Sequence, residues 1–174
     1  MRPPMSDLIV PAVVIAGTVA AAFVDLKTRR VPNVLTMPLA AIGVLLAATG
    51  VSQISVGASI VGGIVGLAVM LPAHVLGATG AGDVKLLAAV GTLLGPAGVM
   101  VAFIGTAIAG GLLALIVAAR RGVIQRTLSQ TALLVSAGRA GVAAIESPQA
   151  NNRFAYAPAI AIGAAIAALD LLRS

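Results

Sequence analysis

The stretch that decides the fold is residues 86–119, LLAAVGTLLGPAGVMVAFIGTAIAGGLLALIVAA, which contains no charged side chain. A run of about 18 or more apolar residues is typical of a membrane-spanning helix, because the hydrocarbon core of a bilayer is about 30 Å thick. These 34 residues are too many for one ordinary span and few for two. Proline cannot continue a helix in the usual way, so Gly95-Pro96 is the expected break. The stretch therefore predicts two helices, over about 83–95 and 97–119.

Four more apolar runs extend the same pattern along the chain. They predict further spans over about 8–24, 34–51, 54–76 and 154–172. Of the 174 residues, 60% are hydrophobic and 9% are charged, whereas a soluble domain has about 25% charged residues. A water-soluble fold of this size could not bury so much apolar surface. We therefore expect an all-α, polytopic membrane helix bundle of about six transmembrane helices, forming a single domain over residues 1–174.

The basic residues indicate how the bundle is oriented, because the cytoplasmic loops of membrane proteins carry an excess of Lys and Arg. If the N-terminus lies outside, nine of the eleven basic residues fall on the cytoplasmic side, and Arg2 and Arg173 remain outside. The nine are Lys27, Arg29, Arg30, Lys85, Arg120, Arg121, Arg126, Arg139 and Arg153. Membrane topology then explains the net charge of +6 without a nucleic acid partner. Both termini are expected outside the cytoplasm.

Residues 120–153 carry five Arg and are not expected to span the membrane. Their apolar and small residues recur at three- and four-residue spacing, at Ile124, Leu128, Thr131, Val135, Gly138, Val142 and Ile145. This pattern predicts an amphipathic helix on the cytoplasmic surface of the membrane. A solvated loop with chance periodicity stays open as the alternative.

Only five acidic residues are present, and two of them lie beside apolar helices on the expected cytoplasmic side. Asp7, Glu146 and Asp170 fit solvated charges at helix ends or in the polar loop. Asp25 ends the first predicted span, and Asp83 begins the fourth. Counting spans therefore places these two carboxylates on one face at similar depth. An ionisable group at membrane depth costs about 2.5–3.5 kcal/mol, so each requires a reason.

Two neighbouring carboxylates that share a proton are the machinery of an aspartyl peptidase. The predicted fourth span, 83–95, has 13 residues and would be about 20 Å long. Because it is shorter than the hydrocarbon core, Asp83 is expected below the membrane surface. Gly77, Gly80 and Gly82 supply the backbone freedom that a non-helical approach at this depth needs.

A structural alternative stays open from the spacing alone. In that alternative Asp25 and Asp83 are only partners of nearby basic residues, which are Lys27, Arg29, Arg30 and Lys85. Other catalytic classes have little support, because the chain has no Cys and a single His, His74. This composition excludes a thiol nucleophile and a multi-His metal site, and no metal or other cofactor is expected. His74, near the end of the third predicted span, is interpreted as structural.

Two motifs resemble those of the type IV prepilin peptidases, a family of GxGD intramembrane aspartyl peptidases. Residues 25–33, DLKTRRVPN, resemble the first motif, an Asp followed by a basic loop and an aliphatic-Pro-Asn. Residues 80–88, GAGDVKLLA, resemble the second, the GxGD signature with its trailing Lys. Residues 156–163, YAPAIAIG, look like the family's last helix, although Ala155 and Ala157 stand where the family often has Pro and Gly.

The resemblance implies that Asp25 and Asp83 are the catalytic pair and that no metal takes part. It implies a pilin precursor as substrate, with a short basic leader and a hydrophobic helix, cut at the cytoplasmic face of the bacterial inner membrane. Because the chain begins almost directly with its first predicted helix and has no Cys, it is similar to the short Flp/Tad-type form without the methyltransferase region. Supporting or substrate-binding positions by this resemblance are Lys27, Gly80, Gly82 and Lys85.

Two other function classes stay open. The chain could be a small transporter or channel subunit that uses Asp25 and Asp83 as ion or proton sites at a Gly-broken helix. Such proteins often show inverted internal repeats, and none is recognisable in this sequence. The chain could also be a membrane scaffold of a pilus machine without catalysis, although its intact carboxylates argue against that role.

Overall fold

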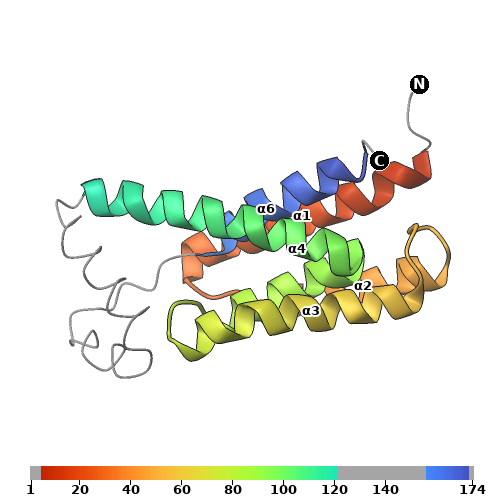
Figure 1. Cartoon of the computed structure of the whole chain (residues 1–174), viewed down its shortest axis with the longest axis horizontal. Coiled ribbons are helices and arrows are strands. Elements are labelled where there is room, and N and C mark those ends of the chain that lie inside the picture. The colour runs from red at the N-terminus through yellow and green to blue at the C-terminus, as the bar shows by residue number, and fades with distance from the viewer. Residues whose placement is uncertain (1–4, 121–155, 173–174) are drawn as a thin grey trace.

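The computed structural model of the chain describes residues 5–120 and 156–172, and every regular element in these residues is a helix. The helices are α1 (Met5–Thr28), α2 (Asn33–Ala48), α3 (Val56–Val75), α4 (Ala81–Arg120) and α6 (Ala157–Asp170). They lie roughly along one long axis (Figure 1). The prediction of an all-α bundle is confirmed. The amphipathic helix predicted at 120–153 falls outside the described residues from residue 121 on.

Three helices are long and apolar enough to cross a membrane, namely Leu8–Thr28 in α1, Val56–Val75 in α3 and Ala81–Val117 in α4. Helices α2 and α6 are also apolar but have only 16 and 14 residues, fewer than the ~20 of an ordinary span. The described residues thus support a helical membrane protein. Three of its helices reach spanning length, where the sequence predicted six.

Helix α4 consists of two helices joined at a sharp break. Its 37-residue apolar part would be about 55 Å long as a straight helix, nearly twice the thickness of the hydrocarbon core. Gly95 interrupts it with φ 72° and ψ −177°, and Pro96 follows. Glycine adopts such a positive φ easily because it has no Cβ. The break predicted at Gly95-Pro96 is confirmed, and we call residues 81–94 the first limb and residues 96–120 the second limb of α4.

The two limbs run in opposite directions (Figure 1). The first limb is antiparallel to α3, because Leu87 lies against Gly66 whereas Gly91 lies against Gly62. These contacts are between backbones, since a Cβ on Gly66 would lie 2.6 Å from the Leu87 carbonyl oxygen. Small residues at such positions let membrane helices pack closely through van der Waals contact.

The second limb is antiparallel to α6 by the same kind of contact. Gly163 of α6 lies against Ala102 and Thr106, and Tyr156 lies against Gly110. Helix α6 therefore covers one side of the second limb from its middle towards its end. Since the first limb pairs with α3 and the second with α6, the break at Gly95 connects two halves of the bundle.

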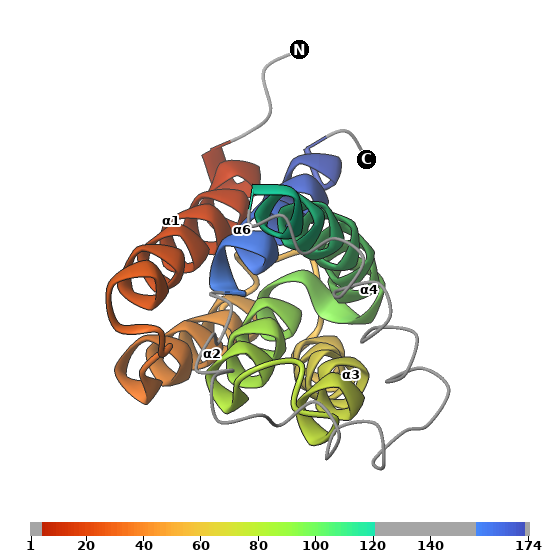
Figure 2. The ribbon, with the colours of Figure 1, turned by 90° about the vertical axis from the view of Figure 1, so that its left-hand side faces the viewer.

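The first limb lies at the centre of the bundle, between α2, α3 and α6 in the end-on view of Figure 2. From Asp83 to Gly95 the only exposed side chain is that of Lys85. A helix that is apolar all round belongs in a core. The large, fully buried side chains of this limb are Leu86, Leu87, Val90 and Leu93.

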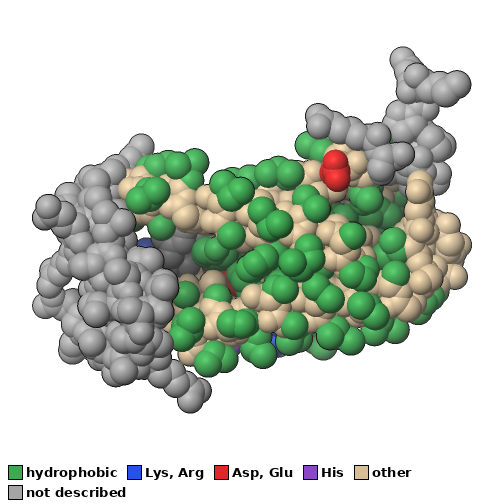
Figure 3. All heavy atoms as spheres, in the orientation of Figure 1, with side chains coloured by type: hydrophobic (Ala, Val, Ile, Leu, Met, Phe, Trp, Pro, Cys, Tyr) green, Lys and Arg blue, Asp and Glu red, His purple; other side chains and the backbone are tan. Residues whose placement is uncertain are grey.

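The outer surface of the bundle is apolar. Figure 3 shows hydrophobic side chains spread over the visible face, with almost no charged group among them. Several large side chains are more than half exposed, including Val34, Met37, Ile64 and Ile108. Such a surface is unfavourable in water and favourable against lipid tails, which agrees with a membrane protein.

One end of the bundle, at the left of Figure 1, holds the ends of α1 and α3 and the beginnings of α2, α4 and α6. We call it the carboxylate end, because Asp25 and Asp83 lie there. Helix α1 continues to Thr28, beyond the predicted end at residue 24. It stops where Arg29 adopts φ 53°, and the Arg29 N–H donates to the Asp25 carbonyl oxygen at 2.7 Å. Asp25 therefore lies in the last turn of α1 rather than after it.

Candidate active site

The Asp25 carboxylate links the first and last helices of the bundle. Its side chain is 4% exposed, and its Oδ2 accepts a hydrogen bond from the backbone N–H of Ala157 at 3.2 Å. Ala157 is the first residue of α6, where backbone N–H groups have no partner within the helix and the helix dipole favours negative charge. The start of α6 therefore holds one oxygen of Asp25 in a fixed position.

The Asp83 carboxylate lies in the first turn of α4 and is 6% exposed. Its Oδ2 accepts a hydrogen bond from the backbone N–H of Gly80 at 3.0 Å. Gly80 directly precedes the helix, so this contact is the backward half of a capping box, in which an acidic residue three positions on reaches the N-terminal N–H. The other oxygen, Oδ1, is buried and has no hydrogen-bond partner among the described residues. A buried oxygen without a partner is rare and indicates a functional position.

The two carboxylates lie close enough for electrostatic interaction with each other. They come from helices separated by more than fifty residues, and the packing of α1, α4 and α6 brings them to one place. Tyr156, the residue before α6, is also within electrostatic range of Asp83. The structure therefore brings the two predicted catalytic residues together at one end of an apolar bundle.

Gly80 and Gly82 have a different function from the one predicted. Neither has a positive φ, whereas Gly77 has φ 77°. A Cβ on Gly82 would lie 2.7 Å from the carbonyl oxygen of Val31, so Gly82 allows the start of α4 to pack against the loop between α1 and α2. A Cβ on Gly80 would lie 3.2 Å from Asp83 Oδ2. Both glycines permit close approach, and only Gly77 uses its backbone freedom.

The two lysines predicted as supporting residues make contacts away from the carboxylates. The Lys85 Nζ donates to Asn33 Oδ1 at 2.9 Å, and the Lys27 Nζ lies 4.3 Å from the centre of the Phe23 ring. Both lysine side chains are exposed. Neither contact involves a carboxylate, so these contacts give no support to the alternative in which Asp25 and Asp83 serve as partners of the two lysines.

Two residues near the site were not predicted to take part in it. Tyr156 precedes α6, and His74 Nδ1 makes a 2.9 Å hydrogen bond to the Thr79 carbonyl oxygen in the loop before Asp83. Each is the single residue of its type in the chain. Their rarity is the one sequence signal that could have drawn attention to them, because both lie close to the motifs that contain the aspartates.

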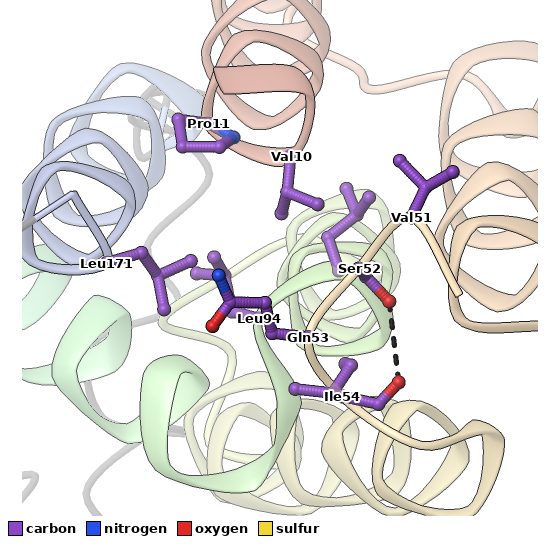
Figure 4. Close-up of a pocket in the computed structure, with 9 residues that line it drawn as sticks. Val10, Pro11, Val51, Ser52, Gln53, Ile54, Leu94 and Leu171 are labelled. Atoms are coloured by element: carbon purple, nitrogen blue, oxygen red, sulfur yellow. Dashed lines mark hydrogen bonds between the residues drawn. The ribbon is translucent and has the colours of Figure 1, made fainter. Parts of the chain in front are cut away.

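A pocket lies at the opposite end of the bundle (Figure 4). It is lined by the beginning of α1, the loop between α2 and α3, the end of the first limb and Leu171. Apart from Ser52 and Gln53 its lining is apolar, and it contains no ionisable side chain. Acid–base chemistry therefore belongs to the carboxylate end. No group of three or more His, Cys, Asp or Glu side chains suited to a metal occurs in the part of the chain that the structure describes.

A sequence profile of the type IV leader peptidase family matches residues 12–115, which is more than half of the chain. The chain belongs to the type IV leader peptidase family. The matched region includes Asp25, Asp83 and the two glycines before Asp83, and it ends before α6. Comparison with curated proteins and with solved structures found no significant match. Membership of this family indicates a peptidase, and the apolar helices indicate that this leader peptidase relative acts in a membrane.

Proposed function

We propose that this chain is an intramembrane aspartyl endopeptidase in which Asp25 and Asp83 are the catalytic pair. The observation that carries the proposal is the meeting of two buried carboxylates, one from α1 and one from α4, at one end of an otherwise apolar bundle. Burying such groups is costly unless they have partners or a function. Each aspartate has one oxygen held by a backbone N–H, which fixes its position but does not remove its acid–base capacity.

The chemistry requires one ionised and one protonated carboxyl. The ionised member removes a proton from a water molecule as the water oxygen attacks the peptide carbonyl carbon. The protonated member donates to the carbonyl oxygen, on which negative charge develops. Collapse of the tetrahedral intermediate then breaks the C–N bond, and the leaving amine takes a proton from the carboxyl that accepted it. Two close carboxylates are suited to this exchange because they cannot both ionise easily.

The substrate class proposed is the precursor of a Flp or type IV-like pilin, cut between its basic leader and its hydrophobic helix. Membership of the leader peptidase family supports this substrate class. The apolar outer surface of the bundle suits a substrate helix that lies in the same membrane. In this proposal the whole chain acts as one domain.

Cleavage is proposed to occur at the cytoplasmic face of a bacterial inner membrane, with both termini on the other side. Lys27, Arg29, Arg30 and Lys85 support this orientation, because all four belong to the segments that form the carboxylate end. Lys and Arg mark the cytoplasmic side of membrane proteins. The first limb of α4 is about 21 Å long, shorter than the hydrocarbon core, which is consistent with Asp83 lying below the membrane surface.

The test is cleavage of a co-expressed Flp-type prepilin by the intact chain, Asp25→Asn and Asp83→Asn at matched membrane levels. Asparagine keeps an oxygen that accepts from Ala157 N–H or Gly80 N–H, so the helix contacts remain while the acid–base group is lost. Asp170→Asn is the matched control, because Asp170 is an exposed carboxylate at the opposite end of the bundle.

The expected result is precursor shortening by the intact chain and by Asp170→Asn, and a loss of at least 10²-fold in both active-site variants. Persistent cleavage by either Asp25→Asn or Asp83→Asn would show that the pair does not act as an aspartyl dyad. In that case the two carboxylates would be tested next as proton or ion sites of a transporter or channel subunit.

A further inference from the structure

The connection between α3 and α4 is fixed by a chain of hydrogen bonds that ends on Asp83. Helix α3 finishes in a Schellman motif, in which Gly77 has φ 77°. The N–H of Gly77 donates to the His74 carbonyl oxygen at 2.9 Å, and the N–H of Ala78 donates to the Ala73 carbonyl oxygen at 2.9 Å. These two bonds satisfy the last carbonyl groups of α3 with backbone donors alone. The imidazole of His74 is therefore not needed to end the helix.

The imidazole instead contacts the peptide group between Thr79 and Gly80. His74 Nδ1 lies 2.9 Å from the Thr79 carbonyl oxygen. A carbonyl oxygen can only accept, so Nδ1 carries the hydrogen and donates it. The N–H of the same peptide group, on Gly80, donates to Asp83 Oδ2 at 3.0 Å. One peptide group thus has His74 on its oxygen and Asp83 on its nitrogen.

We infer that His74 is a positioning residue for the proposed catalytic reaction, which orients Asp83 through the Thr79–Gly80 peptide group. By holding the carbonyl oxygen, the imidazole fixes the plane of the peptide and therefore the direction of the Gly80 N–H that Asp83 accepts. A hydrogen bond to an amide oxygen also strengthens the N–H of the same amide as a donor, because bonds in a chain polarise one another. This inference rests on the proposed function of Asp83.

The surroundings of His74 support a function beyond packing. Its side chain is half-buried, and it lies within electrostatic range of the Asp83 carboxylate. The Asp83 Oδ1 atom has no partner within the described residues, so the bond from Gly80 to Oδ2 is the recorded polar contact that orients this carboxyl. Loss of the imidazole would leave the Thr79 carbonyl free to turn, and the Gly80 N–H would turn with it.

Three substitutions of His74 separate positioning from packing. In His74→Asn the amide nitrogen stands three bonds from Cα, as Nδ1 does in histidine, and it can donate to the Thr79 carbonyl. In His74→Gln the amide nitrogen is one carbon further away, at the distance of Nε2. His74→Leu keeps an apolar side chain with good helix propensity and removes the donor. Val75→Ala changes an exposed neighbour on the same turn and is the matched control.

The measurement is steady-state cleavage of a purified Flp-type prepilin in detergent micelles, with kcat and KM determined for each variant and Asp83→Asn as the zero reference. We expect His74→Leu and His74→Gln to lower kcat on the order of 10-fold, because a small misplacement of a catalytic group has effects of this size or larger. KM should change less than about twofold, since the substrate contacts are kept. His74→Asn should recover most of the lost kcat, and Val75→Ala should behave as the intact chain.

Two outcomes would overturn the inference. If cleavage depends on Asp83 while His74→Leu retains the kcat of the intact chain, His74 has no positioning function although the proposed function stands. The same conclusion follows if His74→Asn is as slow as His74→Leu at equal thermal stability. If Asp83→Asn itself cleaves, the proposed function fails first, and the inference about His74 fails with it.

Discussion

The two limbs of α4 are close in composition and opposite in environment. The first limb, residues 81–94, is enclosed by other helices, and beyond Gly82 it exposes only the side chain of Lys85. The second limb, residues 96–120, packs one side against α6 and exposes large apolar side chains along the other. These are Met100, Val101, Ile104, Ile108, Leu112, Leu115 and Ile116. The first limb is therefore a core helix, and the second is a helix facing lipid.

The difference explains where a carboxylate can lie. Asp83 begins the enclosed limb, so neighbouring backbone rather than lipid surrounds it, and Gly80 supplies a hydrogen bond. The same group on the exposed face of the second limb would meet hydrocarbon, where a charge has no partner. A short, enclosed helix thus provides a protected position for ionisable chemistry inside an apolar molecule.

Alanine substitution of one glycine in each limb should break this comparison most strongly. In Gly91→Ala the new methyl group would collide with the carbonyl of Gly62 in α3, which should destabilise the fold by about 3 kcal/mol or prevent folding, because both neighbours are backbone. In Gly111→Ala the methyl group meets no atom within 4 Å, and the better helix propensity of alanine should stabilise by about 0.5–1 kcal/mol. Thermal unfolding in detergent measures both effects.

Equal stability of Gly91→Ala and the intact chain would contradict the enclosed position of the first limb. A marked loss of stability in Gly111→Ala would contradict the open face of the second limb. Because both substitutions add one methyl group to the same α4 helix, differences in expression or detergent affect them alike.

Gly82→Ala should have a smaller effect on folding and a clear effect on activity. Its methyl group would lie 2.7 Å from the Val31 carbonyl oxygen, so the start of α4 must shift away from the loop between α1 and α2. We expect prepilin cleavage to fall by about 10- to 100-fold, because Asp83 moves with this turn. The variant should still unfold cooperatively in detergent. Full activity would show that the close approach at Gly82 does not set the position of Asp83.

Lys85→Met should have the smallest effect, because Lys85 is the exposed exception in the enclosed limb. The substitution removes the 2.9 Å contact with Asn33 and retains an unbranched apolar side chain of similar length. An exposed polar contact contributes less than about 1 kcal/mol, so stability and cleavage should change little. Asn33→Ala tests the other partner. A loss of cleavage in Lys85→Met but not in Asn33→Ala would assign Lys85 a direct function toward the substrate.

Much of the candidate site could be predicted from the sequence, and its partners could not. Asp25 and Asp83 were predicted because carboxylates beside apolar runs are rare and the number of intervening spans places them on one side. The contacts of Lys27, Lys85 and His74 could not be predicted, because side-chain partners depend on which helices are neighbours. The six predicted spans exceeded the three helices of spanning length, because hydropathy marks apolar runs and not where a helix begins and ends.

The sequence by itself determined the helical membrane class, the break at Gly95-Pro96 and the two chemically active residues. Each of these follows from local properties, which are the hydropathy of a run, the backbone limits of Gly and Pro, and the cost of charge among apolar residues. Only the tertiary structure decided that the first limb of α4 is enclosed and that the start of α6 meets Asp25 across 132 residues of sequence. Lipid and protein interiors are both apolar, so hydropathy cannot distinguish them, and the choice between them depends on close packing between helix backbones.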